Sequence, residues 1–158
     1  MRPMTKVLFV CLGNICRSPM AEFIFRDMVE KRGLGGQISC ASAATSDEEW
    51  GNPVYPPARR KLAEMGLTCA GKRARTLTPR DYQEYDLLIG MEQRNLSAMR
   101  RICGGDPEGK IHLMLEDSAA PRDIADPWYT GDFDTACRDI QEGCEAWLNR
   151  IQKQMEKS

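Results

Sequence analysis

Cys11 and Arg17 form a Cys-x5-Arg pattern near the start of the chain, and Ser18 and Pro19 follow directly. A short loop between such residues can turn its backbone N–H groups inward. The guanidinium and the N-terminus of a following helix add positive charge, which favours bound oxyanions such as phosphate. A cysteine at the mouth of this cradle would be held as the nucleophilic thiolate. The pattern therefore predicts a phosphate-binding loop with a built-in nucleophile.

Phosphoryl transfer to a cysteine also needs an acid that protonates the leaving oxygen. The chain has a single histidine, His112, for which we expect a structural role, so a carboxylate is the expected donor. The polar stretch 116–132 contains four aspartates, of which Asp123, Asp126 and Asp132 are the candidates. Asp126 is the favoured one, because Pro127 restricts its backbone to extended conformations.

Strand and helix patterns alternate along the chain. The continuous apolar run at 6–11 predicts a buried strand, and Ser18 and Pro19 are expected to cap and open the next helix. Further strands are expected at 37–42, 85–91 and 110–115, and helices at about 18–32, 53–65, 92–103 and 133–155.

This alternation predicts an α/β fold: a three-layer αβα sandwich with a four-stranded, parallel, doubly wound sheet. Ligands of such folds bind at the carboxyl ends of the strands, where the predicted loop lies.

The length of 158 residues fits one domain that spans residues 1–158. A formal net charge of -1 gives no sign of a nucleic-acid or membrane partner, and the apolar run 7–12 is too short for a bilayer. Seven cysteines without a Cys-x2-Cys pair do not indicate zinc. We expect a cytoplasmic protein.

Two segments resemble the low-molecular-weight protein tyrosine phosphatase family: CLGNICRSPMAE at residues 11–22 and DPWY at residues 126–129. The resemblance continues through residues 42–46, the Gly51-Asn-Pro turn and the strand at 85–91, so that it covers essentially the whole chain. Cys-x5-Arg alone is only moderately specific. The complete dozen residues together with Asp-Pro-aromatic are highly specific.

The resemblance implies hydrolysis of phosphotyrosine and small aryl phosphates through a cysteinyl-phosphate, with no metal and no cofactor required. Cys11 would be the nucleophile, Arg17 would bind two phosphate oxygens, and Asp126 would act first as acid and then as base for the attacking water. The expected partners are a tyrosine-phosphorylated protein as substrate and inorganic phosphate as product, with the enzyme a monomer or weak dimer. The remaining phosphate-binding residues would be Leu12, Gly13, Asn14, Ile15, Cys16 and Ser18.

The same resemblance implies supporting roles for two further contacts. The Ser18 hydroxyl would stabilise the thiolate, and Asn14 would hold a strained turn through a hydrogen bond with Ser42. Three aromatic side chains are expected at the rim of the substrate site: Trp50, Trp128 and Tyr129. For Trp50, a half-buried surface position without contact to the substrate is an equally good interpretation.

Several features leave alternatives open. Many family members have histidine where this chain has Met65 and some where it has Lys72, so a polar network there must be built differently. Cys16 is either a filler of the loop or the partner of Cys11 in a protective, reversible disulfide. The basic residues between 72 and 80 are typical of a solvated face, with a bias toward acidic phosphopeptides as the alternative.

Three other functions compete with this one. Arsenate reductases of the same fold carry resolving cysteines around the third strand, and residues 85–91 contain none. Phosphoarginine phosphatases share the scaffold, but Ile15 fits the tyrosine-directed members better. A phosphate-binding module without turnover would not need Cys11, Arg17 and Asp126 together.

Overall fold

The computed structural model describes residues 4–157, which form four strands and six helices. None of the described helices combines the length and apolar character that a membrane crossing requires. The elements in chain order are β1 (Thr5–Cys11), α1 (Arg17–Lys31), β2 (Ile38–Ala44), α2 (Pro56–Glu64), α3 (Pro79–Glu84), β3 (Leu87–Gly90), α4 (Gln93–Cys103), β4 (Ile111–Leu113), α5 (Pro127–Thr130) and α6 (Phe133–Glu156).

The four strands form one parallel sheet in the order β2-β1-β3-β4, which confirms the predicted α/β fold. β1 lies between β2 and β3, so the chain leaves it toward one edge and later returns to its other side. The carboxyl end of β1 is therefore the switch point at which such folds bind ligands. Cys11, the last residue of β1, pairs with Ala44 of β2 at this edge.

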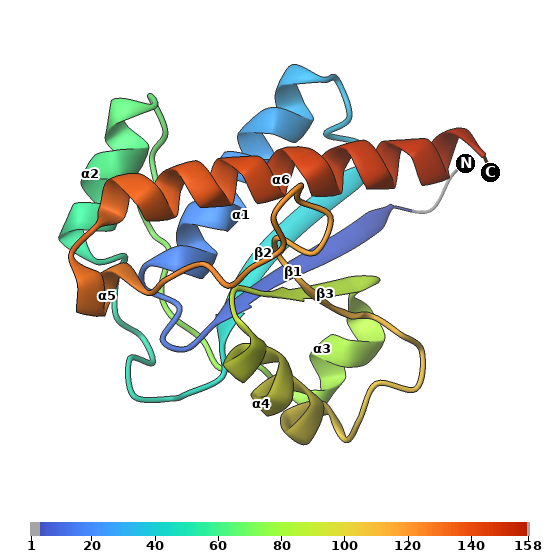
Figure 1. Ribbon diagram of the computed structural model, residues 1–158, viewed down its shortest axis with the longest axis horizontal. Coiled ribbons are helices and arrows are strands. Elements are labelled where there is room, and N and C mark those ends of the chain that lie inside the picture. The colour runs from blue at the N-terminus through green and yellow to red at the C-terminus, as the bar shows by residue number, and fades with distance from the viewer. Residues whose placement is uncertain (1–3, 158) are drawn as a thin grey trace.

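Helices cover both faces of the sheet (Figure 1). α1, α2 and α6 enclose the larger hydrophobic core, in which Phe9 and Phe25 meet edge to face with ring centroids 5.3 Å apart. α3 and α4 enclose a smaller core on the opposite face. α4 packs closely on β3 because Gly90 has no side chain: a Cβ there would lie 2.7 Å from Leu96 Cδ2.

Two short helices occur in stretches for which no helix was predicted. α3 begins after a capping box in which Thr78 and Asp81 satisfy each other's backbone groups. α5 is a single turn that begins at Pro127, with the Asp126 side chain accepting a hydrogen bond from the Trp128 N–H at 3.1 Å. In both cases a side chain compensates for the few hydrogen bonds of a short helix.

Two predicted helix starts were wrong. α1 begins at Arg17, so that Ser18 lies inside the helix and its hydroxyl is used elsewhere. α2 begins at Pro56 rather than at residue 53, because Pro53 is extended and bridges to Arg73 in antiparallel fashion.

Candidate active site

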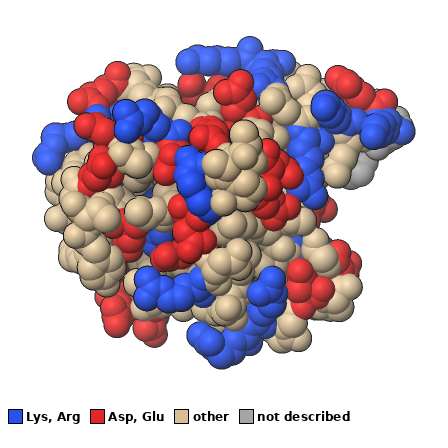
Figure 2. All heavy atoms as spheres, viewed as in Figure 1, with Lys and Arg blue, Asp and Glu red and all other residues tan. Residues whose placement is uncertain are grey.

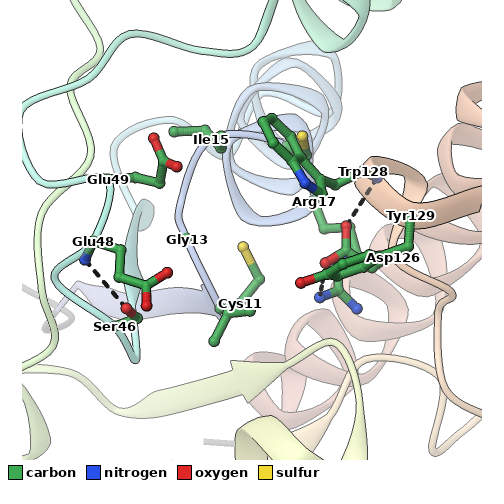
Figure 3. A pocket seen from close by; sticks show the side chains of 12 residues that line it. Cys11, Gly13, Ile15, Arg17, Ser46, Glu48, Glu49, Asp126, Trp128 and Tyr129 are labelled. Carbon is green, nitrogen blue, oxygen red and sulfur yellow. Dashed lines mark hydrogen bonds and ion pairs between the residues drawn. The ribbon is translucent and has the colours of Figure 1, made fainter. Parts of the chain in front are cut away.

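A cavity of about 180 Å³ lies at the carboxyl end of β1 (Figure 3). Residues of the predicted phosphate-binding loop, 11–17, line this cavity and would form its floor. The loop 45–51 closes one side and the segment around α5 the other. Segments more than a hundred residues apart thus meet at one cavity. Its lining residues are Cys11, Leu12, Gly13, Ile15, Cys16, Arg17, Ser46, Glu48, Glu49, Asp126, Trp128 and Tyr129.

Cys11 lies at the base of this cavity and is 3% exposed. Its Sγ accepts hydrogen bonds from the backbone N–H groups of Asn14 and Ser18, both at 3.4 Å. The Ser18 Oγ lies 3.0 Å from the same sulfur. These donors and the N-terminus of α1 all favour negative charge on the sulfur.

The loop between β1 and α1 leaves several backbone donors available. Within the described chain, five of its amide groups donate no hydrogen bond to the protein, which is the requirement for a backbone cradle that binds an oxyanion. They belong to Leu12, Gly13, Ile15, Cys16 and Arg17.

Asn14 fixes the shape of this loop. Its φ is 60°, and no other non-glycine residue among 4–157 has a positive φ. Its Nδ2 donates to Ser18 Oγ at 2.7 Å and to Ser42 Oγ at 2.9 Å, while its Oδ1 accepts from the Arg75 N–H at 3.2 Å. Because Ser18 Oγ accepts from Asn14, its own hydrogen can point to one of two acceptors, the Cys11 sulfur at 3.0 Å or the Ala43 carbonyl at 3.5 Å. The link from Asn14 to Ser42 that the resemblance implied is therefore present.

The network continues beneath the loop to a buried ion pair. Ser42 Oγ donates to Glu22 Oε1 at 2.6 Å. Lys72 Nζ lies 3.2 Å from the same carboxylate oxygen and donates to the Ser42 carbonyl at 3.1 Å. Lys72 thus supplies the polar support at a position where some family members have histidine. Met65 does not take part, since its sulfur instead accepts contacts from Cys137 and Gln141 of α6.

Arg17 is buried, with a side chain only 1% exposed, and its guanidinium is held on three sides. Nη1 donates to the Ile124 carbonyl at 2.8 Å. Nη2 lies 3.1 Å from Glu92 Oε1 and 3.3 Å from Asp126 Oδ2. The guanidinium is therefore oriented before any ligand binds, which lowers the entropic cost of binding phosphate.

Trp128 and Tyr129 form one wall of the cavity and are 49% and 73% exposed. Trp128 packs on Tyr55 with ring centroids 4.6 Å apart, and Tyr55 in turn packs on Phe133. Trp50 is 70% exposed and lies outside the residues that line the cavity.

The basic residues between 72 and 80 do not line the cavity either. Lys72 is paired below the loop, Arg75 binds Asp81 at 3.1 Å, and Arg73 donates to the Gly51 carbonyl at 3.4 Å. Their arrangement gives no support to a bias toward acidic phosphopeptides. His112 bonds to Glu116 at 2.9 Å and meets Trp147 edge to face, contacts that are structural.

The sequence reading missed several residues of the site. Glu92 lies two residues after the end of β3, and an acidic residue near the carboxyl end of a parallel strand is a signal that could have revealed it. Glu22 lies in the motif at residues 11–22, but nothing in the sequence predicts its hydrogen bond with Ser42. Glu48 and Glu49 lie in a loop whose path the sequence does not determine.

The family model for low molecular weight phosphotyrosine protein phosphatases matches residues 6–157. The chain belongs to this family. The low molecular weight protein-tyrosine-phosphatase YfkJ of Bacillus subtilis is 40% identical over 153 residues, which cover 96% of this chain and 98% of the relative. The crystal structure of YfkJ gives a TM-score of 0.92 with 41% identity and covers 97% of this chain and 98% of that chain.

Two further comparisons bear on this phosphatase. The low molecular weight phosphotyrosine protein phosphatase of Gallus gallus is 35% identical over 149 residues, covering 91% of this chain and 94% of the relative. The crystal structure of the Drosophila arginine phosphatase DARP is 29% identical with a TM-score of 0.86, covering 93% of this chain and 98% of that chain. The chain is an enzyme of the protein-tyrosine-phosphatase type.

Proposed function

We propose that this phosphatase hydrolyses phosphotyrosine in proteins through a cysteinyl-phosphate intermediate. The Cys11 thiolate attacks the phosphorus, the bond between phosphorus and the tyrosine oxygen breaks, and Asp126 donates a proton to that oxygen. The observation that carries the proposal is the convergence of a hydrogen-bonded Cys11 sulfur, the oriented Arg17 guanidinium and the Asp126 carboxylate at one cavity.

In the second step Asp126, now ionised, takes a proton from a water molecule that attacks the phosphocysteine. The phosphorus–sulfur bond breaks, the Cys11 thiolate is regenerated and inorganic phosphate leaves. Ser18 supports the leaving sulfur through its contact at 3.0 Å. Arg17 and the free backbone donors of the loop bind the phosphoryl oxygens throughout, where their fixed positions stabilise the transition state.

The depth of the site supports an aromatic substrate. Cys11 is almost fully buried, while Trp128 and Tyr129 rise beside it as exposed walls. A phosphotyrosine side chain is long enough to reach the sulfur and flat enough to lie against an aromatic wall. The shorter phosphoserine is not.

Phosphoarginine is the alternative substrate, supported by the likeness to the Drosophila arginine phosphatase. Turnover should therefore be compared on three peptides that differ only in phosphotyrosine, phosphoserine or phosphoarginine, with arsenate reduction as a control. We expect the phosphotyrosine peptide to be preferred. A preference for phosphoarginine would replace this proposal, and arsenate reduction would show redox chemistry instead.

We also propose the reversible Cys11–Cys16 disulfide. Peroxide would oxidise the Cys11 thiolate to sulfenic acid, and the Cys16 sulfur would displace water. Burial, the charge of Cys11 and the charge of Asp126 raise the pKa of the Cys16 thiol. Oxidation of Cys11 removes one of these causes. Peptide mapping after peroxide treatment tests the proposal, which fails if Cys11 becomes sulfonic acid instead.

The state of assembly, monomer or weak dimer, and the cytoplasmic location stay predictions. Sedimentation of the purified enzyme and fractionation of cells that produce it would test them.

A further inference from the structure

The wall of the cavity opposite Trp128 and Tyr129 is acidic. It is formed by the loop that follows β2, in which Asp47, Glu48 and Glu49 are consecutive. Figure 3 shows the side chains of Glu48 and Glu49 on one side of Cys11, and Asp126 with the two aromatic residues on the other. Acidic side chains also gather at the lower left edge of the face in Figure 2, where Figure 1 draws the loop 45–51.

Glu48 is exposed, and its carboxylate has no hydrogen-bond or ion-pair partner among residues 4–157. Its backbone N–H donates to Ser46 Oγ at 3.1 Å, a local turn that holds the residue at the rim. In Figure 3 the carboxylate points over the cavity toward Cys11. This charge is therefore placed where a bound peptide would pass and is available to pair with it.

Glu49 is half-buried and packed on the phosphate-binding loop. Its Cγ lies 3.3 Å from the position that a Cβ on Gly13 would occupy, so the absence of a side chain there admits this approach. One carboxylate oxygen, Oε2, accepts from Asn52 Nδ2 at 2.7 Å. Asn52 is neutral, so the negative charge of Glu49 is positioned without being compensated.

The charge balance of the cavity is unfavourable for an acidic peptide. The twelve described lining residues include three carboxylates, Glu48, Glu49 and Asp126, and one cation, Arg17. Arg17 already faces two carboxylates and would be occupied by the phosphate. The exposed Arg94 does not supply a second positive charge to the cavity. It lies 3.7 Å from Glu92 and is not among the residues that line the cavity. A substrate cation beside the phosphotyrosine would supply the missing positive charge.

We propose that Glu48 and Glu49 make the enzyme prefer phosphotyrosine flanked by lysine or arginine. The inference rests on the proposed function and specifies its substrate class. The phosphate and ring would occupy the floor and the aromatic wall, and the flanking ammonium or guanidinium would pair with the acidic wall. A flanking glutamate or aspartate would face like charge at the same place, which lowers both association rate and affinity.

The test uses two peptides that are identical except for lysine or glutamate on both sides of the phosphotyrosine. The measured quantity is the ratio of kcat/KM for the lysine peptide to that for the glutamate peptide. We expect a ratio of about fivefold or more for the wild-type enzyme, from the range measured for exposed ion pairs. Added sodium chloride should reduce the ratio because salt screens exposed charges.

Glu48→Gln and Glu49→Gln remove the charge but keep the shape, and each should bring the ratio closer to one. Glu145→Gln is the matched control, since it removes the same charge from an exposed position on α6. It should leave the ratio unchanged. Because each ratio is taken within one variant, a change in the overall turnover of that variant does not affect it.

A wild-type ratio at or below one, or an equal shift in all three variants, would overturn the inference. If both peptides are hydrolysed equally, the inference alone fails. If neither phosphotyrosine peptide is hydrolysed but a peptide with another phosphorylated residue is, the proposed function fails and the inference fails with it.

Discussion

Asp126 makes two contacts in the structure, and one substitution separates its capping contact from its proposed role as the acid. Its Oδ1 caps α5 through the Trp128 N–H, and its Oδ2 contacts Arg17. Asn can keep the cap, because it is as good a capping residue as Asp, but it cannot donate the proton of a carboxylic acid. The exchange therefore keeps the cap but removes both the proposed acid and the ion pair with Arg17, and the dependence on the leaving group tells these two losses apart.

We expect Asp126→Asn to reduce kcat by roughly 10²–10⁴-fold on phenyl phosphate, whose leaving group is poor. The loss on p-nitrophenyl phosphate should be smaller, since that leaving group needs less protonation. Steady-state rates on the two substrates, with the melting temperature as a control for folding, measure this. Equal losses on both substrates would argue against Asp126 as the acid.

The residue scale also shows what the sequence could not reveal. Cys11, Arg17 and Asp126 were predictable because each carries a recognisable motif. The contacts of Glu92 and Glu22 were not predicted: the first reaches Arg17 because β3 ends beside β1, and the second, although it lies in the motif, reaches Ser42 because α1 packs on β2. Their roles depend on contacts between distant parts of the chain.

At the scale of elements, the loop between β1 and α1 depends on Asn14. A positive φ is costly for most side chains, and three polar contacts of the Asn14 amide stabilise it here. Glycine at this position would accept the backbone conformation but would lose the contacts. Alanine would lose the contacts and add strain.

We therefore expect both Asn14→Gly and Asn14→Ala to reduce kcat by about tenfold or more, because Ser18 and the loop lose their orientation. The glycine variant should be the more stable of the two, by up to about 1 kcal/mol in free energy of unfolding. Urea denaturation and turnover measure both effects. A stable alanine variant with wild-type kcat would show that the loop does not need Asn14.

The elements that were predicted and those that were missed differ in length and in the source of their stability. β1 and α6 have continuous or periodic apolar patterns that report burial directly. α3 and α5 are only six and four residues long, too short for a periodicity, and depend on the capping box of Thr78 and Asp81 and on the Asp126 cap. The Thr78-Pro-Arg-Asp81 capping box was nevertheless readable in the sequence.

At the scale of the whole molecule, α6 packs on α1 and α2 and contributes to the larger core. Trp147 of this helix is fully buried, whereas Trp50 at the loop by the site is 70% exposed. Trp147→Ala should reduce the free energy of unfolding by about 3–5 kcal/mol, and Trp50→Ala by less than about 0.5 kcal/mol. Urea denaturation measures the free energy of unfolding of both variants. The comparison is matched because each variant replaces a tryptophan with alanine.

The prediction of a single domain is tested in the same experiment. A single cooperative transition, with coincident fluorescence and circular dichroism curves, is expected for the wild type. Two separated transitions would contradict a single domain. A Trp50→Ala variant as unstable as Trp147→Ala would contradict the assigned core.

The central claim of this account is the covalent intermediate on Cys11. Asp126→Ala removes the base that should activate water, so a rapid acid quench of this variant with a phosphorylated aryl substrate should trap phosphocysteine. Mass spectrometry of the peptide containing residues 7–17 should then locate one phosphoryl group on Cys11, and Cys11→Ser should carry none. Continued turnover by wild-type enzyme with no trapped phosphoryl group, or with the group on another residue, would contradict the claim.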